Sequence, residues 1–118
     1  MDQDLMYLRK GMIGTSIKFI RAQRALLKAV APKARRSGAE LKEAAEEYLE
    51  AAEPYDAALQ ELRQYLLVTA EPSEAAAVEL AYTERLIDAL DKEKKVGLKL
   101  ITCHPRIKDH NSEGIDES

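Results

Sequence analysis

The chain has 118 residues, of which 46% are hydrophobic and only 5% aromatic, and its formal net charge is −3. Many of the hydrophobic residues that are not aromatic are alanines, 18 in all. Alanine favours helices and lets them approach closely, so the composition argues against a sheet. The size fits one domain, and the single cysteine excludes an intrachain disulfide framework. No apolar run approaches the ~20 residues that span a bilayer, so we expect a cytoplasmic protein without a membrane partner.

The first expected element is a helix over about residues 4–36. At the helical spacing of about 100° per residue, its apolar side chains form two adjacent rows: Leu5, Met12, Phe19 and Leu26, and beside them Met6, Ile13, Ile20 and Leu27. Together the rows predict an apolar face wide enough to contact two neighbouring helices. Pro32 is expected to kink or end the helix, because proline lacks a backbone donor. The other side carries four basic residues, here called the basic ridge: Lys18, Arg21, Lys28 and Arg35.

The second expected element is a helix over about residues 38–69, whose start fits a capping box of Ser37 and Glu40. Its apolar residues alternate spacings of four and three, as in a coiled coil, and we call them the central seam: Leu41, Ala45, Tyr48, Ala52, Tyr55, Leu59, Leu62 and Leu66. The far side is acidic. Pro54 either separates two short helices or kinks one long helix, and the unbroken seam favours the kink.

The third expected element is a helix over about residues 73–102, with Ser73 as its N-cap. We expect it to bury Val78, Leu80, Tyr82, Leu86, Ile87, Leu90, Val96 and Leu100. The periodicity stops at Cys103, so residues 103–118 are expected to form a flexible tail. Because both turns are short, the predicted fold class is all-α: an antiparallel three-helix bundle with coiled-coil-like packing and a Pro-kinked central helix. We expect a monomer rather than a homodimer.

The sequence offers little for catalysis or for binding a cofactor. Cys103, His104 and His110 could ligate zinc, but adjacent ligands are poorly spaced for a closed four-ligand site, so we expect a solvated tail. A di-metal carboxylate site would need Glu-x-x-His pairs on the helices, and the expected helices contain no histidine. We therefore expect no catalytic residue, no metal and no cofactor, and a protein that is not an enzyme.

The basic ridge has three interpretations. Such a ridge is most often solvated or paired within its own molecule, and the best functional alternative is contact with an acidic protein. Nucleic acid is disfavoured by the isoelectric point near 5.5 and by the charge of the next helix. Residues 1–40 carry nine Lys and Arg against three Asp and Glu, whereas residues 41–91 carry three against thirteen.

Taken in order, several segments resemble the tubulin-binding cofactor A family of three-helix β-tubulin chaperones. The first helix contains Leu8-Arg9-Lys10 and Ile17-Lys18-Phe19-Ile20-Arg21, and the third spans Ala77 to Leu90 with Leu86-Ile87-Asp88. The second helix contains Leu41-Lys42, Leu49-Glu50, Pro54-Tyr55-Asp56 and the stretch from Leu59 to Leu66. The resemblance covers roughly residues 5–90, and the family similarly has a proline followed closely by Asp inside its long second helix.

The resemblance implies a chaperone, associated with the microtubule cytoskeleton, that captures β-tubulin and delivers it for assembly of the αβ-tubulin heterodimer, without nucleotide or metal. The candidate partner-binding residues are Lys18, Arg21, Lys28, Arg35, Tyr55 and Asp56, and the kink at Pro54 would set the curvature of the contact surface. Two other functions stay open. One is a self-associating helical scaffold that uses the central seam between chains, and the other is a polyanion or nucleic-acid binder that uses the first helix.

Overall fold

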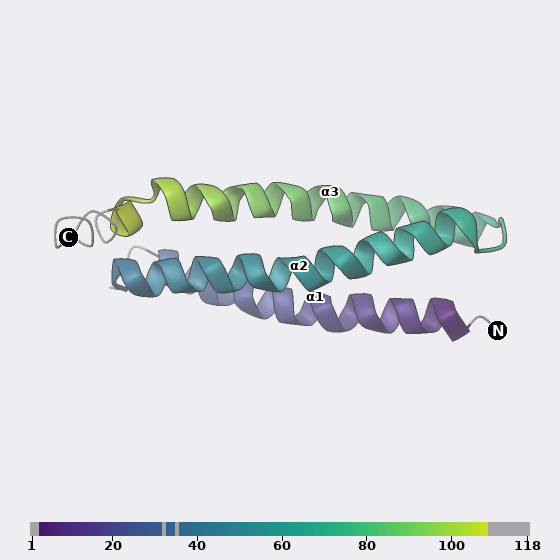
Figure 1. Cartoon of the computed structure of the whole chain (residues 1–118), viewed down its shortest axis with the longest axis horizontal. Helices are drawn as coiled ribbons and strands as arrows, with labels where there is room; N and C mark the ends of the chain where they lie inside the picture. The colour runs from purple at the N-terminus through teal and green to yellow at the C-terminus, as the bar shows by residue number, and fades with distance from the viewer. Residues whose placement is uncertain (1–2, 32, 35, 109–118) are drawn as a thin grey trace.

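Three long helices make up the protein, as the sequence predicts. The computed structural model describes residues 3–31, 33–34 and 36–108, and over these residues it contains no strand. The helices are α1 (Gln3–Val30), α2 (Gly38–Val68) and α3 (Glu74–Cys103), and each runs antiparallel to the one before it (Figure 1). They form an elongated three-helix bundle of 59 × 23 × 20 Å, so the predicted all-α fold class is confirmed.

Serine side chains start α2 and α3. The Ser37 hydroxyl accepts a hydrogen bond from the Glu40 amide at 3.1 Å, and the Ser73 hydroxyl accepts one from the Ala76 amide at 3.0 Å. Each bond satisfies an amide that has no partner in the first turn of a helix. The reciprocal half of the predicted capping box differs, because the Glu40 carboxylate accepts from the Ser37 hydroxyl at 3.4 Å and pairs with Arg36 at 3.2 Å.

The first helix is shorter than predicted and the second is continuous. Helix α1 ends at Val30 rather than near residue 36, since the residue before a proline is disfavoured in the α conformation and Pro32 follows closely. Helix α2 runs through Pro54 without a break, which confirms the single long helix. Pro54 falls near the middle of its range, and Figure 1 shows α2 changing direction near its middle.

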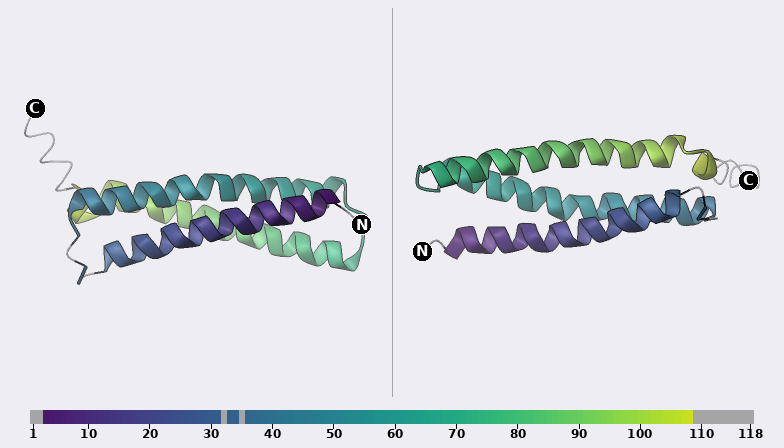
Figure 2. Two further views of the ribbon diagram at one scale, coloured as in Figure 1. Left: turned by 90° about the horizontal axis from the view of Figure 1, so that it is seen from below. Right: turned by 180° about the vertical axis from the view of Figure 1, so that it is seen from behind.

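The central seam forms most of the core. All eight seam residues of α2 are buried, as predicted: Leu41, Ala45, Tyr48, Ala52, Tyr55, Leu59, Leu62 and Leu66. Helix α1 buries Phe19, Leu26 and Ala29 against them. Helix α2 lies between the other two helices and packs against both of them (Figures 1 and 2).

One predicted core row of α1 and three predicted core residues of α3 are exposed instead. Met6, Ile13, Ile20 and Leu27 of α1 are 43–65% exposed, although the sequence predicted that their row would help α1 to contact a second helix. Val78, Tyr82 and Val96 of α3, which were predicted to be buried, are 54–65% exposed. The reason is that α1 and α3 each pack against α2 and not against each other. Over the described residues of the two helices, no Cα atom of α1 lies within 8 Å of a Cα atom of α3.

The folded part of the chain extends past residue 102, so the predicted tail needs correction over residues 103–108. Helix α3 includes Cys103, and residues 105–108 form one more helical turn. Ile107 on this turn is completely buried in the core. The Arg106 guanidinium donates hydrogen bonds to the carbonyls of Val30 and Arg36, both at 3.2 Å, and so joins the last turn of α1 to the segment just before α2. The rest of the predicted tail, 109–118, lies outside the described residues.

Candidate partner-binding surfaces

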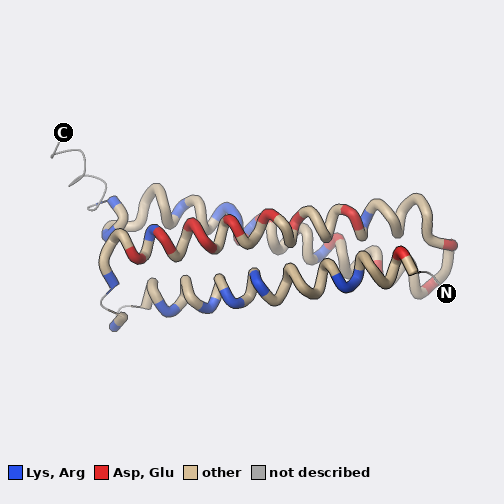
Figure 3. The backbone as a smooth tube through the Cα atoms, turned by 60° about the horizontal axis from the view of Figure 1, so that its bottom comes forward, with Lys and Arg blue, Asp and Glu red and all other residues tan. Residues whose placement is uncertain are grey.

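The basic ridge lies on the solvent-exposed side of α1. Lys18, Arg21 and Lys28 are all exposed, and none of them forms an ion pair or a hydrogen bond with another residue that the structure describes. Arg35, the fourth member, lies outside the described residues. Figure 3 shows the Lys and Arg positions along α1 facing a run of Asp and Glu positions along α2. Three unpaired cations on one helix therefore remain available to a partner.

The ridge borders an acidic surface of α2 across a shallow hollow. The hollow is lined by Arg21, Arg24, Lys28 and Arg36 on one side and by Glu40, Glu43 and Glu47 on the other. Among the described residues that line it, only Arg36 and Glu40 form an ion pair. Charges this close act within one Debye length of about 8–10 Å, so the glutamates weaken the positive field of the ridge. The result is a surface of both signs rather than an isolated basic surface.

Tyr55 and Asp56 do not lie on the same surface as the ridge. Tyr55 is only 8% exposed, and its ring centre lies 5.5 Å from that of Phe19. Burial, together with the nearby Tyr82, raises the pKa of the Tyr55 hydroxyl. Asp56 accepts a hydrogen bond from the Lys94 ammonium group of α3 at 3.0 Å. The six candidate residues therefore divide into an exposed ridge and a pair that takes part in helix packing.

Lys94 connects α3 to both sides of the proline in α2. Its ammonium group lies 3.0 Å from the Asp56 carboxylate and 3.4 Å from the Glu53 carboxylate, and these two residues flank Pro54 closely in the sequence. Burial by itself would lower the pKa of Lys94, but the two carboxylates outweigh it and raise that pKa. The side chain of Lys94 is 21% exposed, so this pairing is screened only in part by solvent. It holds α3 against the bent middle of α2.

A second polar contact joins all three helices. The Tyr48 hydroxyl of α2 donates to the Glu93 carboxylate of α3, and Gln23 of α1 donates to the same carboxylate at 3.4 Å. Burial raises the pKa of Tyr48, and the adjacent Glu93 raises it further. The Tyr48 ring also packs against Phe19, with ring centres 5.0 Å apart. Because each polar group here has a partner, the arrangement is suited to positioning the helices rather than to proton transfer.

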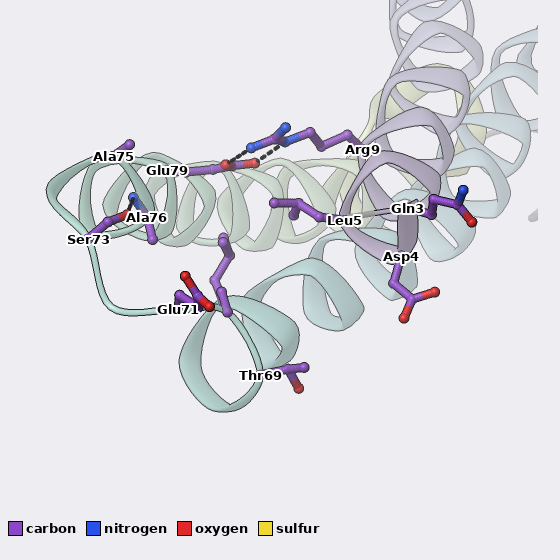
Figure 4. Close-up of a pocket in the computed structure, with 12 residues that line it drawn as sticks. Gln3, Asp4, Leu5, Arg9, Thr69, Glu71, Ser73, Ala75, Ala76 and Glu79 are labelled. Carbon is purple, nitrogen blue, oxygen red and sulfur yellow. Dashed lines mark hydrogen bonds and ion pairs between the residues drawn. The ribbon is translucent and has the colours of Figure 1, made fainter. Parts of the chain in front are cut away.

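One end of the bundle contains an open hollow between the start of α1 and the start of α3. Figure 4 shows Leu5 pointing into it from α1, with the Arg9 side chain beside it reaching Glu79 of α3. The Arg9 Nε atom donates to Glu79 at 2.8 Å. The guanidinium is therefore engaged by a carboxylate and is not a free anion-binding group.

Residues suited to metal binding are scattered. No group of three or more His, Cys, Asp and Glu within the described ranges could hold a metal ion. Cys103 is exposed, His104 accepts a hydrogen bond from the Arg106 amide at 3.3 Å, and His110 lies outside the described residues. None of the described helices is both long and apolar enough to cross a membrane.

Arg106 and Ile107 are the residues that the sequence analysis missed. The available signal was Pro105, two residues after the end of α3, with the large apolar Ile107 soon after it, because proline often follows a helix end and begins a new turn. No family model matches the chain, and no curated protein or solved structure matches it either. What the protein does must therefore be inferred from its residues, their geometry and the sequence resemblance.

Proposed function

We propose that this chain is a non-catalytic chaperone that captures β-tubulin and delivers it for assembly of the αβ-tubulin heterodimer. The observation that carries the proposal is the row of exposed cations on α1, Lys18, Arg21 and Lys28, which have no partner among the described residues. An acidic protein surface is the natural complement of such a row. The choice of β-tubulin, and of a cytoplasmic location at the microtubule cytoskeleton, follows from the sequence resemblance.

Contact with a protein is favoured over contact with a polyanion. Nucleic acid binds through a field of positive charge, and the glutamates of α2 that line the hollow beside the ridge weaken that field. A protein surface of mixed charge tolerates this arrangement, since its own cations can face Glu43 and Glu47. If the chain were retained on a polyanion column with a steep dependence on salt, a polyanion would be the better candidate.

Self-association through the central seam has lost its main support. Leu41, Ala45, Ala52 and Leu59 are completely buried within one chain, so the seam would have to leave its own α1 and α3 before it could pair with another copy. Light scattering tests this alternative directly. A dimer at low concentration would support a scaffold, whereas a monomer agrees with the chaperone proposal.

The direct test is pull-down of β-tubulin with the purified chain. The double variant Arg21→Glu and Lys28→Glu replaces attraction by repulsion at the ridge, so capture should fall at least about tenfold. The matched control is Lys95→Glu, which reverses an exposed charge on α3 that is paired with Asp91 at 3.2 Å. Unchanged capture by the double variant would exclude the ridge as the contact, and no capture by the unmodified chain would exclude the proposed function.

A further inference from the structure

The bundle exposes two apolar rows that repeat every seven residues. The α1 row consists of Met6, Ile13, Ile20 and Leu27, and the α3 row consists of Ala75, Tyr82, Ala89 and Val96. All eight residues are exposed. A seven-residue repeat keeps apolar side chains in one line along a helix, and such lines are what coiled coils use to pack against another helix.

The two rows lie in the same register. The side-chain bridges between α1 and α3, Arg9 to Glu79 and Gln23 to Glu93, both join residues that are 70 apart in the sequence. Members of the α1 row and the α3 row differ by 69 at every level, from Met6 and Ala75 to Leu27 and Val96. Each row member of one helix is therefore level with a row member of the other.

Both rows also border the same side of the bundle. On α1, Met6 and Ile13 stand three and four residues from Arg9, and Ile20 and Leu27 stand at the same spacing from Gln23. On α3, the members of the α3 row stand three or four residues from Glu79 or Glu93. Residues at these spacings are neighbours on one face of a helix. The rows are thus adjacent to the α1–α3 bridges, on the side away from α2. No described residue covers them there.

The separation between α1 and α3 leaves room for one more helix. Helices that pack with axes about 10 Å apart bring Cα atoms to roughly 5–6 Å, because Cα atoms lie about 2.3 Å from the axis. Helices α1 and α3 keep their Cα atoms more than 8 Å apart, and they cross at a shallow angle in the left view of Figure 2. They resemble diagonal helices of a four-helix bundle, with α2 at the third corner and the fourth corner open.

The outer edges of this open corner are basic. Beside the α1 row stand Lys10 and Arg24, each four residues after a row member, and then Lys28 of the basic ridge. Arg24 and Lys28 also line the hollow that they share with the glutamates of α2. Beside the α3 row stand Arg85, Lys92 and Lys99, each three residues after a row member. All six are exposed. The acidic exceptions are Glu74 at the first turn of α3 and Asp88, which lies two seven-residue repeats further along the same helix.

We infer that the open corner between α1 and α3 is a docking groove for an amphipathic helix of a partner protein, with an aliphatic seven-residue repeat flanked by Asp and Glu. The aliphatic residues would pack between the two rows, and the flanking carboxylates would meet the basic edges. The inference deepens the proposed function, since it rests on the protein-binding part of it and not on the identity of the partner.

A second copy of the chain is a poorer occupant than an acidic helix. Two copies joined through this face would bring basic edges against basic edges, which is repulsive. The acidic helix of the chain itself, α2, buries its apolar seam internally and exposes mainly glutamates, so it has no apolar row to insert. The partner helix must therefore come from another protein.

The test uses synthetic helical peptides and the full chain. One panel has Leu and Ile in a seven-residue repeat, in several registers, with Glu at the flanking positions, and a matched panel has Lys there. Binding is followed by fluorescence anisotropy. We expect peptides of the Glu panel to bind and those of the Lys panel not to bind, with affinity that falls as salt rises because the edges are exposed.

Variants of the chain test whether the peptide binds in the groove. Ile20→Asn and Tyr82→Asn put a polar side chain into the two rows and should weaken binding of the Glu panel at least about tenfold. The matched controls are Tyr7→Asn and Leu98→Asn, which change exposed apolar residues on other faces of the same two helices. All four sites are exposed, so the variants should fold, and circular dichroism checks this.

The outcomes are distinguishable. No binding of any Glu peptide, equal binding of both panels, or an equal loss in the row variants and the controls would overturn the groove. Binding only to vesicles that contain phosphatidylserine would assign the face to a membrane surface, and a dimer abolished by Ile20→Asn would assign it to a second copy; both overturn the inference. Failure of the Glu panel with intact capture of β-tubulin would reject the groove alone, and the reverse would reject only the tubulin proposal.

Discussion

A methyl group added at Gly97 tests how closely α3 approaches α2. A Cβ atom at Gly97 would lie 2.9 Å from Cδ2 of Leu49 and 3.1 and 3.2 Å from two ring carbons of Tyr48, whereas carbon atoms in contact normally stay about 3.5–4.0 Å apart. The Leu49 methyl is the end of a flexible side chain and can move. The Tyr48 ring cannot move freely, because it packs on Phe19 and its hydroxyl is bonded to Glu93.

Two opposite effects determine how much the Gly97→Ala substitution changes the free energy of unfolding. Alanine is favoured over glycine in a helix by about 1 kcal/mol, whereas an extra methyl group in a packed core costs about 1–3 kcal/mol. We therefore expect the free energy of unfolding to fall by about 1 kcal/mol. Gly14→Ala is the control, because no heavy atom lies within 4 Å of a Cβ added there. It should raise the free energy of unfolding by about 0.5–1 kcal/mol.

Urea unfolding of both variants, followed by far-ultraviolet circular dichroism, measures the packing term. The gain in helix propensity is common to the two substitutions, so the difference between them is the steric cost at Gly97, expected to be about 1–3 kcal/mol. In thermal unfolding this corresponds to roughly 3–6 °C per kcal/mol for a chain of this size. Equal stability of the two variants, or a more stable Gly97→Ala, would refute the close contact between α3 and the Tyr48 ring.

Three further predictions concern stability. Ile107→Ala should lower the free energy of unfolding by about 2–4 kcal/mol in urea unfolding, because Ile107 is fully buried; no loss would mean that the turn at 105–108 does not pack on the bundle. Stability should fall above pH 10, because the pKa of Tyr48 is raised in the fold and the unfolded chain gives up that proton more readily; unfolding across this pH range should show a shallower fall in Tyr48→Phe. Lys94→Met should cost at most about 1 kcal/mol in urea unfolding, because its pairing with Asp56 is partly screened, and a much larger loss would refute this.

The central seam was predictable because its burial depends on periodicity alone. Helix α2 lies between two neighbours, and every apolar residue in its four-and-three pattern is buried. Tyr48 and Tyr55 illustrate this, since both were expected in the core and both are at most 8% exposed. Pro54 was also predictable, since the pattern continues through it and a helix that bends can keep its seam buried.

The outer rows could not be placed from the sequence. An amphipathic pattern gives the width of an apolar face, but it does not say how many neighbours are present in the same chain. The breadth of the face on α1 predicted two neighbouring helices, and that prediction was wrong, because among the described helices only α2 packs closely against α1. Ile13 and Tyr82, opposite each other on the two rows, are 52% and 58% exposed for this reason. The same pattern in a four-helix chain would have been buried.

The candidate contact residues were predictable only in part. The exposure of Lys18, Arg21 and Lys28 follows from their position away from the buried face of α1 that carries Phe19 and Leu26. The partner of Asp56 could not be predicted, because Lys94 is 38 residues away in the sequence and contacts Asp56 only once α2 and α3 have packed. Arg106 is a similar case, since it reaches the last turn of α1 from a segment with no periodicity of its own.

The gap between α1 and α3 is a consequence of the core that α2 provides. Ala45 and Ala52 let the neighbouring helices come close to α2, whereas Tyr48 extends far enough to bond Glu93 at the bridge between α1 and α3. A large ring in the centre of the bundle keeps α1 and α3 apart, and the row residues beyond the bridge then have no neighbour. Tyr48 is only 2% exposed and does not line the proposed groove, but it binds Glu93 at the bridge between α1 and α3, so substitution of Tyr48 would alter both docking and stability. Substitutions in the exposed rows can separate docking from stability, because Ile20 contributes to the groove without being part of the buried core.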